Sequence, residues 1–154
     1  MIFVGVPNSE QKSELAARLP MGRVYVQPMD LAWDCGRHIA FLNLESNADR
    51  DMLGSDYARY LRDSGRDEAS TLQRCRRFLA LRERWRHYKS TRIWAVVTHD
   101  GLRLDGSHRA AVAVAEGYFT VACAVVPYLP ADTDWREVML ALRAEKLHKG
   151  DCSP

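Results

Sequence analysis

The residues whose types and spacing are most suited to binding or catalysis are five consecutive ones, Asp105-Gly106-Ser107-His108-Arg109. They stand between a short alternating stretch and a run of small apolar residues, so the sequence predicts a turn from a strand into a helix. The first turn of a helix has N–H groups without intrahelical partners and the positive end of the dipole. Gly106 lets an anion approach the backbone, and His108 and Arg109 add cationic donors. The combination predicts a phosphate site.

A simpler interpretation of the same residues is structural. Asp105 then caps the helix, and His108 and Arg109 are solvated residues of its first turn. The flanking sequence favours the phosphate site, because both neighbouring elements fix the turn as such a site requires. We therefore take Gly106, Ser107, His108 and Arg109 as cofactor-binding candidates and Asp105 and His108 as catalytic candidates, and we assign no metal ligand.

The residues before the turn predict a β-hairpin. Ile93–Thr98 is β-branched and apolar, which is typical of a strand. His99-Asp100-Gly101 predicts a tight turn in which the glycine supplies a positive φ. Leu102–Asp105 is expected to return as a short strand with two leucines on one side.

The residues after the turn predict a buried helix. Ser107 is a suitable N-cap, and the alanines and valines that follow favour a helix that stops at Gly117. We expect Ser107–Glu116 to be mostly buried. Such a helix would hold the turn rigidly.

Residues 104–113, L-D-G-S-H-R-A-A-V-A, resemble the phosphate-binding turn of the ParB/sulfiredoxin superfamily. The resemblance covers about Ile93 to Val126. Members of this superfamily include partition proteins that bind CTP, sulfiredoxins that use ATP, and small-molecule kinases that phosphorylate free serine. Sulfiredoxins have their catalytic cysteine at the position of Ser107, so we do not expect a sulfiredoxin reaction.

The resemblance to the kinase members implies a nucleotide-dependent phosphotransferase that uses ATP or ADP with Mg²⁺. Its acceptor would be a small hydroxylated metabolite or sugar. A carboxylate would act as base toward the acceptor hydroxyl. Asp105 is the nearest candidate in the sequence, and Glu45 and Asp34 are alternatives.

The alternative function is a non-enzymatic, nucleotide-responsive module that binds DNA or a protein. Its support is a helix expected over Glu68–Lys89, whose apolar residues recur at three- and four-residue steps and whose other face carries arginines such as Arg74, Arg77 and Arg84. A solvated face with internal ion pairs explains the same arginines. The chain has no evident helix-turn-helix, so nucleic acid is the less favoured partner.

The composition bounds these possibilities. With 154 residues, 47% of them apolar, the chain fits one domain with one core. Its 22 Lys and Arg against 20 Asp and Glu neither require nor exclude nucleic acid. The cysteines lack metal-ligand spacing; Cys75 and Cys123 are expected to be buried thiols, and Cys35 near His38 is weak evidence for a site. No stretch is apolar enough to span a membrane, which favours a cytoplasmic protein without a membrane partner.

Other segments complete the expected fold. Ile39–Leu44 is a strand or a buried helical turn, and Ser46–Asp51 is expected to be a loop whose carboxylates, with Glu45, are solvated more often than functional. Asp56–Asp63 is a helix with Tyr57, Tyr60 and Leu61 on one face. The remaining elements are strands at Met1–Val6, Arg23–Gln27 and Phe119–Val126, the last of them central, and helices ending at Leu19 and spanning Asp132–Lys149.

Together, these elements predict an α+β fold in which helices pack on a small mixed β-sheet. The resemblance implies that this fold is ParB/sulfiredoxin-like. We expect a single domain over residues 1–154, with a helical insertion at about 55–90. The sequence carries no signal of the oligomeric state.

Overall fold

The structure, a computed structural model, describes residues 22–98, 101 and 103–126. This part of the chain is mixed α+β, with a four-stranded mixed sheet and six helices, which confirms the expected fold class. It divides into two compact units. The sheet unit contains described residues of 22–26, 90–106 and 120–126, and the helical unit contains residues 27–89 and 107–119. A single domain with a helical insertion remains a prediction.

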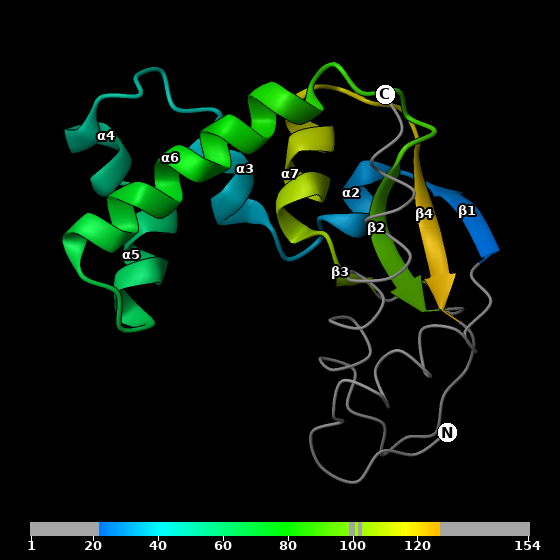
Figure 1. Cartoon of the computed structure of the whole chain (residues 1–154), viewed down its shortest axis with the longest axis horizontal. Coiled ribbons are helices and arrows are strands. Elements are labelled where there is room, and N and C mark those ends of the chain that lie inside the picture. The colour runs from blue at the N-terminus through cyan, green and yellow to red at the C-terminus, as the bar shows by residue number, and fades with distance from the viewer. Residues whose placement is uncertain (1–21, 99–100, 102, 127–154) are drawn as a thin grey trace, which may run out of the picture. The chain divides into compact units, whose positions relative to one another are not determined.

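The sheet has the strand order β1-β4-β2-β3 (Figure 1). β2 (Ile93–Thr98) runs parallel to β4 (Val121–Val126), whereas β1 (Gly22–Val26) and β3 (Arg103–Asp105) are antiparallel to their neighbours. β4 is central, as predicted. The strand was expected to begin at Phe119 but begins at Val121, and the side chain of Phe119 is 83% exposed.

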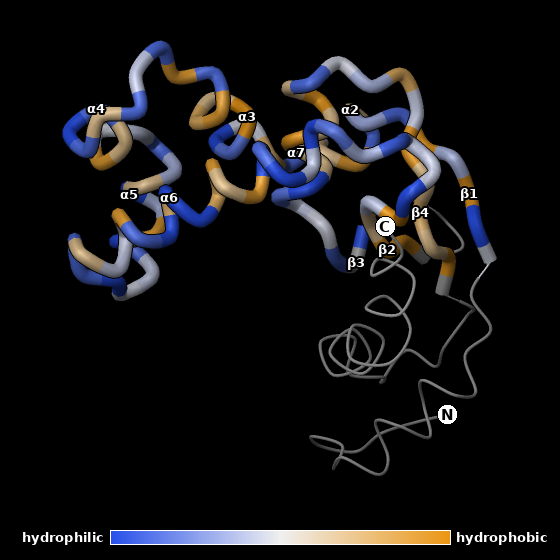
Figure 2. The backbone as a smooth tube through the Cα atoms, turned by 45° about the horizontal axis from the view of Figure 1, so that its top comes forward, coloured by the Kyte–Doolittle hydropathy of each residue, from blue (hydrophilic) through white to orange (hydrophobic). Residues whose placement is uncertain are grey.

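The two central strands supply the core of the sheet unit. Trp94–Val97 and Val121–Ala124 are all buried, and Figure 2 shows hydrophobic residues along both strands. Continuous apolar runs of this kind are typical of strands buried on both faces. β1 differs, because it lies at one end of the strand order and two successive residues, Val24 and Tyr25, are both exposed.

The predicted hairpin is confirmed by the antiparallel pairing of β2 with β3, in which Val96 lies opposite Asp105. Gly101 has a φ of +90°, the positive value that its turn was expected to need. Residues 99, 100 and 102 lie outside the described part of the chain.

Gly106 is required by packing as well as by its backbone angle. Its φ is +102°, and a Cβ built on it would lie 2.6 Å from the Trp94 carbonyl oxygen and 2.9 Å from the Ala95 Cα. A side chain here would therefore collide with the backbone of β2. The sequence had suggested a different reason, the approach of an anion, and the structure adds this structural one.

The helical unit is organised along its longest helix, α6. Figure 1 shows α4 and α5 beside one end of α6 and α7 beside the other, and α3 packs on α5 and α7. The helices are α2 (Pro28–Leu31), α3 (Gly36–Leu42), α4 (Asp49–Leu53), α5 (Asp56–Asp63), α6 (Glu68–Trp85) and α7 (Ser107–Ala115).

Several helix boundaries differ from expectation. The bounds of α5 are as predicted, whereas α6 ends at Trp85 rather than Lys89. The ambiguous segment from Ile39 belongs mostly to α3. The predicted loop over residues 46–51 is wrong from Asp49 onward, because α4 begins there and contacts α6.

The caps and buried faces of α5 and α6 follow their sequences. The Ser55 hydroxyl accepts a hydrogen bond from the Ala58 N–H at the start of α5, and the Asp67 carboxylate accepts one from the Ser70 N–H at the start of α6. Along α6, the buried residues are Thr71, Cys75, Phe78 and Trp85. Of the three residues expected on one face of α5, Tyr57 and Leu61 are buried and Tyr60 is 45% exposed.

α7 is the buried helix that the sequence predicted. Its central residues, Ala110–Ala113, are 0% exposed. The helix begins at Ser107, so the N-cap position falls on Gly106 rather than on Ser107 as expected. At the other end Gly117 has a φ of +75°, and the N–H groups of Gly117 and Tyr118 donate to the Val114 and Ala113 carbonyls. This is a Schellman stop, as the glycine indicated.

Three of the expected elements lie outside the described residues: the strand at Met1–Val6, the helix ending at Leu19 and the helix at Asp132–Lys149. Within the described ranges, no helix combines the length and apolar character that crossing a membrane requires.

Gly106→Ala should destabilise the protein by about 3 kcal/mol, because it combines an unfavourable φ with overpacking against β2. Gly101→Ala is the matched control. It has a similar φ, but its added Cβ would have no heavy atom within 4 Å, so we expect a loss of only about 1 kcal/mol. Urea unfolding followed by circular dichroism measures both losses. Equal losses would show that the contact with β2 is unimportant.

Candidate functional site

The candidate turn lies where the sequence placed it, between the end of a strand and the start of a helix. β3 ends at Asp105 and α7 begins at Ser107, with Gly106 between them. Ser107, His108 and Arg109 therefore supply the first three backbone N–H groups of α7, which have no acceptor one turn earlier in the helix. All three residues are half-buried.

The side chain of His108 packs in an aromatic cluster of the helical unit. Its ring centroid lies 4.7 Å from that of Phe78, 4.8 Å from that of His38 and 6.0 Å from that of Tyr57. The Tyr57 hydroxyl and His108 Nε2 are 3.0 Å apart and share a hydrogen bond, whose direction depends on the imidazole tautomer. An anion that bound Nε2 would have to displace this hydroxyl.

Tyr57 is a neutral hydroxyl at physiological pH. Burial raises its pKa to about 12, and the positive charges of Arg74 and Arg66 offset part of that rise. Its side chain also contacts the rings of Phe41 and Phe78. Tyr57 therefore fixes the orientation of the His108 ring from α5.

Arg109 lies against an aromatic ring of α6. Its guanidinium carbon is 5.4 Å from the centroid of the buried Trp85 ring, within the range of a cation–π interaction. The contact restricts the long side chain in the first turn of α7. An arginine held in this way loses less conformational entropy when it binds a ligand.

Cys35 connects the segment before α3 to the first turn of α7. Its thiol is buried and lies 3.7 Å from the Ser107 carbonyl oxygen and 3.3 Å from an Asp34 carboxylate oxygen, so its single S–H can donate to either. Cys75 and Cys123 are both 0% exposed, which confirms the prediction of buried thiols.

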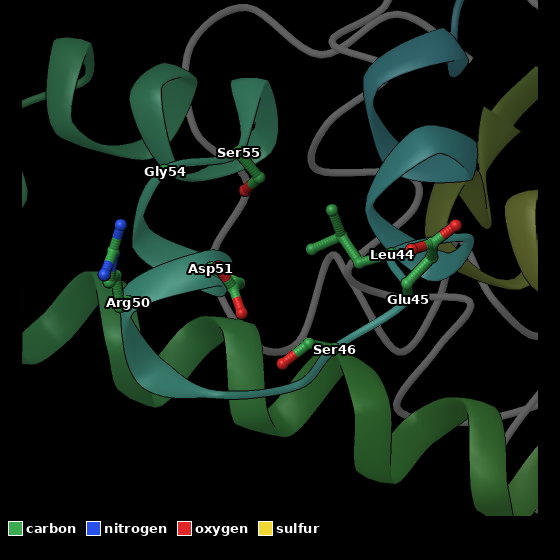
Figure 3. A pocket seen from close by; sticks show the side chains of 7 residues that line it. All are labelled: Leu44, Glu45, Ser46, Arg50, Asp51, Gly54 and Ser55. Atoms are coloured by element: carbon green, nitrogen blue, oxygen red, sulfur yellow. The ribbon is translucent and has the colours of Figure 1, made fainter.

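Two of the carboxylates near α4, those of Glu45 and Asp51, help to line an open pocket of about 570 Å³ (Figure 3). Its lining residues are Leu44, Glu45, Ser46, Arg50, Asp51, Gly54 and Ser55. Asp49 is not among them, since its carboxylate pairs with Arg76 at 2.8 Å. Across the described ranges, no three His, Cys, Asp or Glu side chains form a group that could hold a metal ion. Glu45 and Asp51 thus lie at the edge of a surface hollow, and a functional role for them stays a prediction.

The sequence did not identify the partners of the candidate residues. Tyr57 and Trp85 were expected only as parts of apolar helix faces, and Cys35 was set aside. Their residue types gave one usable signal: buried tyrosine and tryptophan usually pair their polar groups or ring faces with a nearby residue. Which residue they would meet depends on the packing of α5, α6 and α7.

The comparisons with known proteins add no relative. No family model, no curated protein and no solved structure matches the chain.

Tyr57→Phe should change how stability depends on pH. The pKa of Tyr57 is about 12 in the folded protein and 10.0 for an ordinary tyrosine, so the folded state holds this proton more tightly. The resulting stabilisation is complete below pH 10 and is lost as the pH rises through 12, by about 2.7 kcal/mol for two pH units. Tyr57→Phe should lose about 1 kcal/mol at neutral pH with the hydrogen bond, and it should lack that alkaline decline.

Urea unfolding at a series of alkaline pH values measures the difference. Tyr60→Phe, an exposed tyrosine on the same helix, is the control and should behave as the unchanged protein. The same alkaline decline in Tyr57→Phe as in the unchanged protein would contradict the prediction.

Proposed function

We propose that the first turn of α7 binds a phosphate group and that the protein is a nucleotide-dependent phosphotransferase. The nucleotide would be ATP or ADP, and the acceptor a small hydroxylated metabolite or sugar. The proposal extends the resemblance of Asp105–Arg109 and its flanking residues to the kinase members of the ParB/sulfiredoxin superfamily.

The observation that carries the proposal is the backbone geometry of the turn. A strand ends at Asp105, Gly106 follows with a positive φ, and a buried helix begins at Ser107 with consecutive N–H groups at its positive end. Arg109 supplies a guanidinium in the same turn, restrained by Trp85. Helix N-termini of this kind stabilise phosphate through N–H donors and the helix dipole.

Phosphoryl transfer depends mainly on positioning and charge neutralisation, which these groups are suited to provide. The α7 N–H groups and Arg109 would hold the transferred phosphoryl group. Asp105, at the end of β3, is the candidate base toward the acceptor hydroxyl, and His108 is the alternative through its imidazole. Mg²⁺ would enter with the nucleotide and neutralise charge on the phosphate oxygens.

A thermal-shift series with ATP, ADP, CTP and GTP, each with and without Mg²⁺, tests nucleotide binding. A nucleotide at 100 times its dissociation constant should stabilise the protein by about 2.7 kcal/mol. Transfer of labelled γ-phosphate from the bound nucleotide to a panel of hydroxylated metabolites then tests the reaction. Binding without transfer to any acceptor would favour a nucleotide-responsive module that is not an enzyme.

Arg109→Ala should weaken nucleotide binding roughly 10- to 100-fold, because charge-assisted hydrogen bonds to phosphate are each worth about 1.5–3 kcal/mol. Arg109→Lys should restore only part of the affinity, since it lacks the planar fork. Ser107→Ala should have a smaller effect. Titration calorimetry with the best nucleotide measures the change.

Arg59→Ala provides the control, because Arg59 is an exposed arginine of α5 that pairs with Asp56. It should bind nucleotide as the unchanged protein does. Arg109→Ala should still fold, since the residue is only half-buried. Unchanged nucleotide affinity in folded Arg109→Ala would reject this phosphate site.

A further inference from the structure

Positive charge in the helical unit is concentrated in one segment. Residues 74–89 contain seven Lys and Arg and a single acidic residue, Glu83. The remaining residues of this unit, 27–73 and 107–119, contain six Lys and Arg against ten Asp and Glu. The whole chain is nearly neutral, but residues 74–89, which begin within α6 and extend past its end, are strongly basic.

The arginines of this segment divide into two groups. Three are neutralised within the unit: Arg76 pairs with Asp49, Arg82 with Glu116, and Arg86 with Glu83 and Glu116. Arg74, Arg77 and Arg84 make no ion pair with the residues that the structure describes. Ion pairs within the unit, the simpler explanation of the basic face, thus account for only three of the six arginines in this segment.

The unpaired arginines lie on one side of α6. At about 100° per residue, Arg74, Arg77 and Arg84 fall within about 80° of one another around the helix axis, together with Ser70. Arg66 joins them, because its guanidinium donates to the Ser70 hydroxyl at 3.3 Å. We call these four residues the arginine flank: Arg66, Arg74, Arg77 and Arg84.

The arginine flank is accessible and free of acidic residues of α6. Arg66, Arg77 and Arg84 are exposed and Arg74 is half-buried. By the same helical geometry, Glu68 and Glu83 lie on other sides of α6. From Ser70 to Arg84 the helix rises about 21 Å, a length over which one strand of a B-form duplex presents about six phosphates.

We propose that the arginine flank binds the phosphodiester backbone of nucleic acid. A row of arginines that makes no ion pair with the described residues complements a row of phosphates, and each guanidinium fork can take two phosphate oxygens. The contacts would be to the backbone, so binding is independent of sequence and weak, with a dissociation constant of about 10⁻⁴–10⁻⁶ M at physiological salt. The four residues of this surface are different from those of the phosphate site proposed for α7.

The test is fluorescence anisotropy with the full chain and a labelled oligonucleotide, single-stranded or duplex, over a range of salt concentrations. Four phosphate contacts predict a slope of log affinity against log salt of about −3.6 for the duplex and −2.8 for the single strand. Raising the salt from about 50 to 200 mM should then weaken duplex binding about 100-fold. Comparing the two affinities shows whether the arginine flank prefers single-stranded or duplex nucleic acid.

The double variant Arg77→Gln with Arg84→Gln should halve the slope, so that the same change in salt weakens duplex binding only about 10-fold. Both positions are exposed, and glutamine is nearly as good a helix former as arginine, so folding should be retained. The matched control is Arg59→Gln with Arg76→Gln. It removes the same charge from two arginines that are already paired, with Asp56 and Asp49, and it should keep the original slope.

Arg109→Ala should bind the oligonucleotide as the unchanged protein does, so this result is independent of nucleotide binding at α7. Three outcomes would overturn the proposal. The first is no binding at about 20 mM salt, where counterion release favours binding most. The second is an equal decrease of the salt slope in the two double variants. The third is that polyglutamate competes with the oligonucleotide as strongly as a phosphodiester of equal charge does. The last outcome would point to an acidic protein partner instead.

Discussion

The helical unit depends on the burial of a helix made of very small residues. Ala110–Ala113 are 0% exposed, and α2, α3 and α6 all pack on α7. Small side chains let these helices approach closely, so a larger residue at any of the four positions would overpack the contact. The same packing fixes the first turn of α7, where Ser107, His108 and Arg109 stand. The position of the candidate phosphate site is thus a consequence of alanine burial.

Local sequence signals predicted the parts of the fold that depend on neighbours in the chain. The hairpin of β2 and β3, the strand-to-helix turn and the Gly117 stop follow from turn glycines and from a change in apolar period. The central place of β4 follows from its unbroken apolar run. Predictions failed where tertiary contacts decided the outcome: α4 forms against α6 in a segment whose polar residues indicated a loop.

The surroundings of the candidate site could not be predicted in this way. The partner of His108 is Tyr57, 51 residues away in the chain, and the ring beside Arg109 belongs to Trp85. Both contacts arise because α5 and α6 meet α7 in space. The sequence could indicate that His108 and Arg109 begin a helix, but the side of that helix that each would face depends on the crossing of three helices.

Burial explains why arginines of similar sequence context behave differently. The side chains of Arg82 and Glu116 are only 22% and 15% exposed, so each charge needs the other, because a partly buried charge without a partner is costly. Arg82 also donates to the Leu42 carbonyl, which joins α6 to the end of α3. Exposed arginines such as Arg77 and Arg84 remain hydrated, so their charges need no ion pair within the chain and are accessible to a partner outside it. The total charge of +2 averages these two classes, and only the burial and the ion pairs of each arginine separate them.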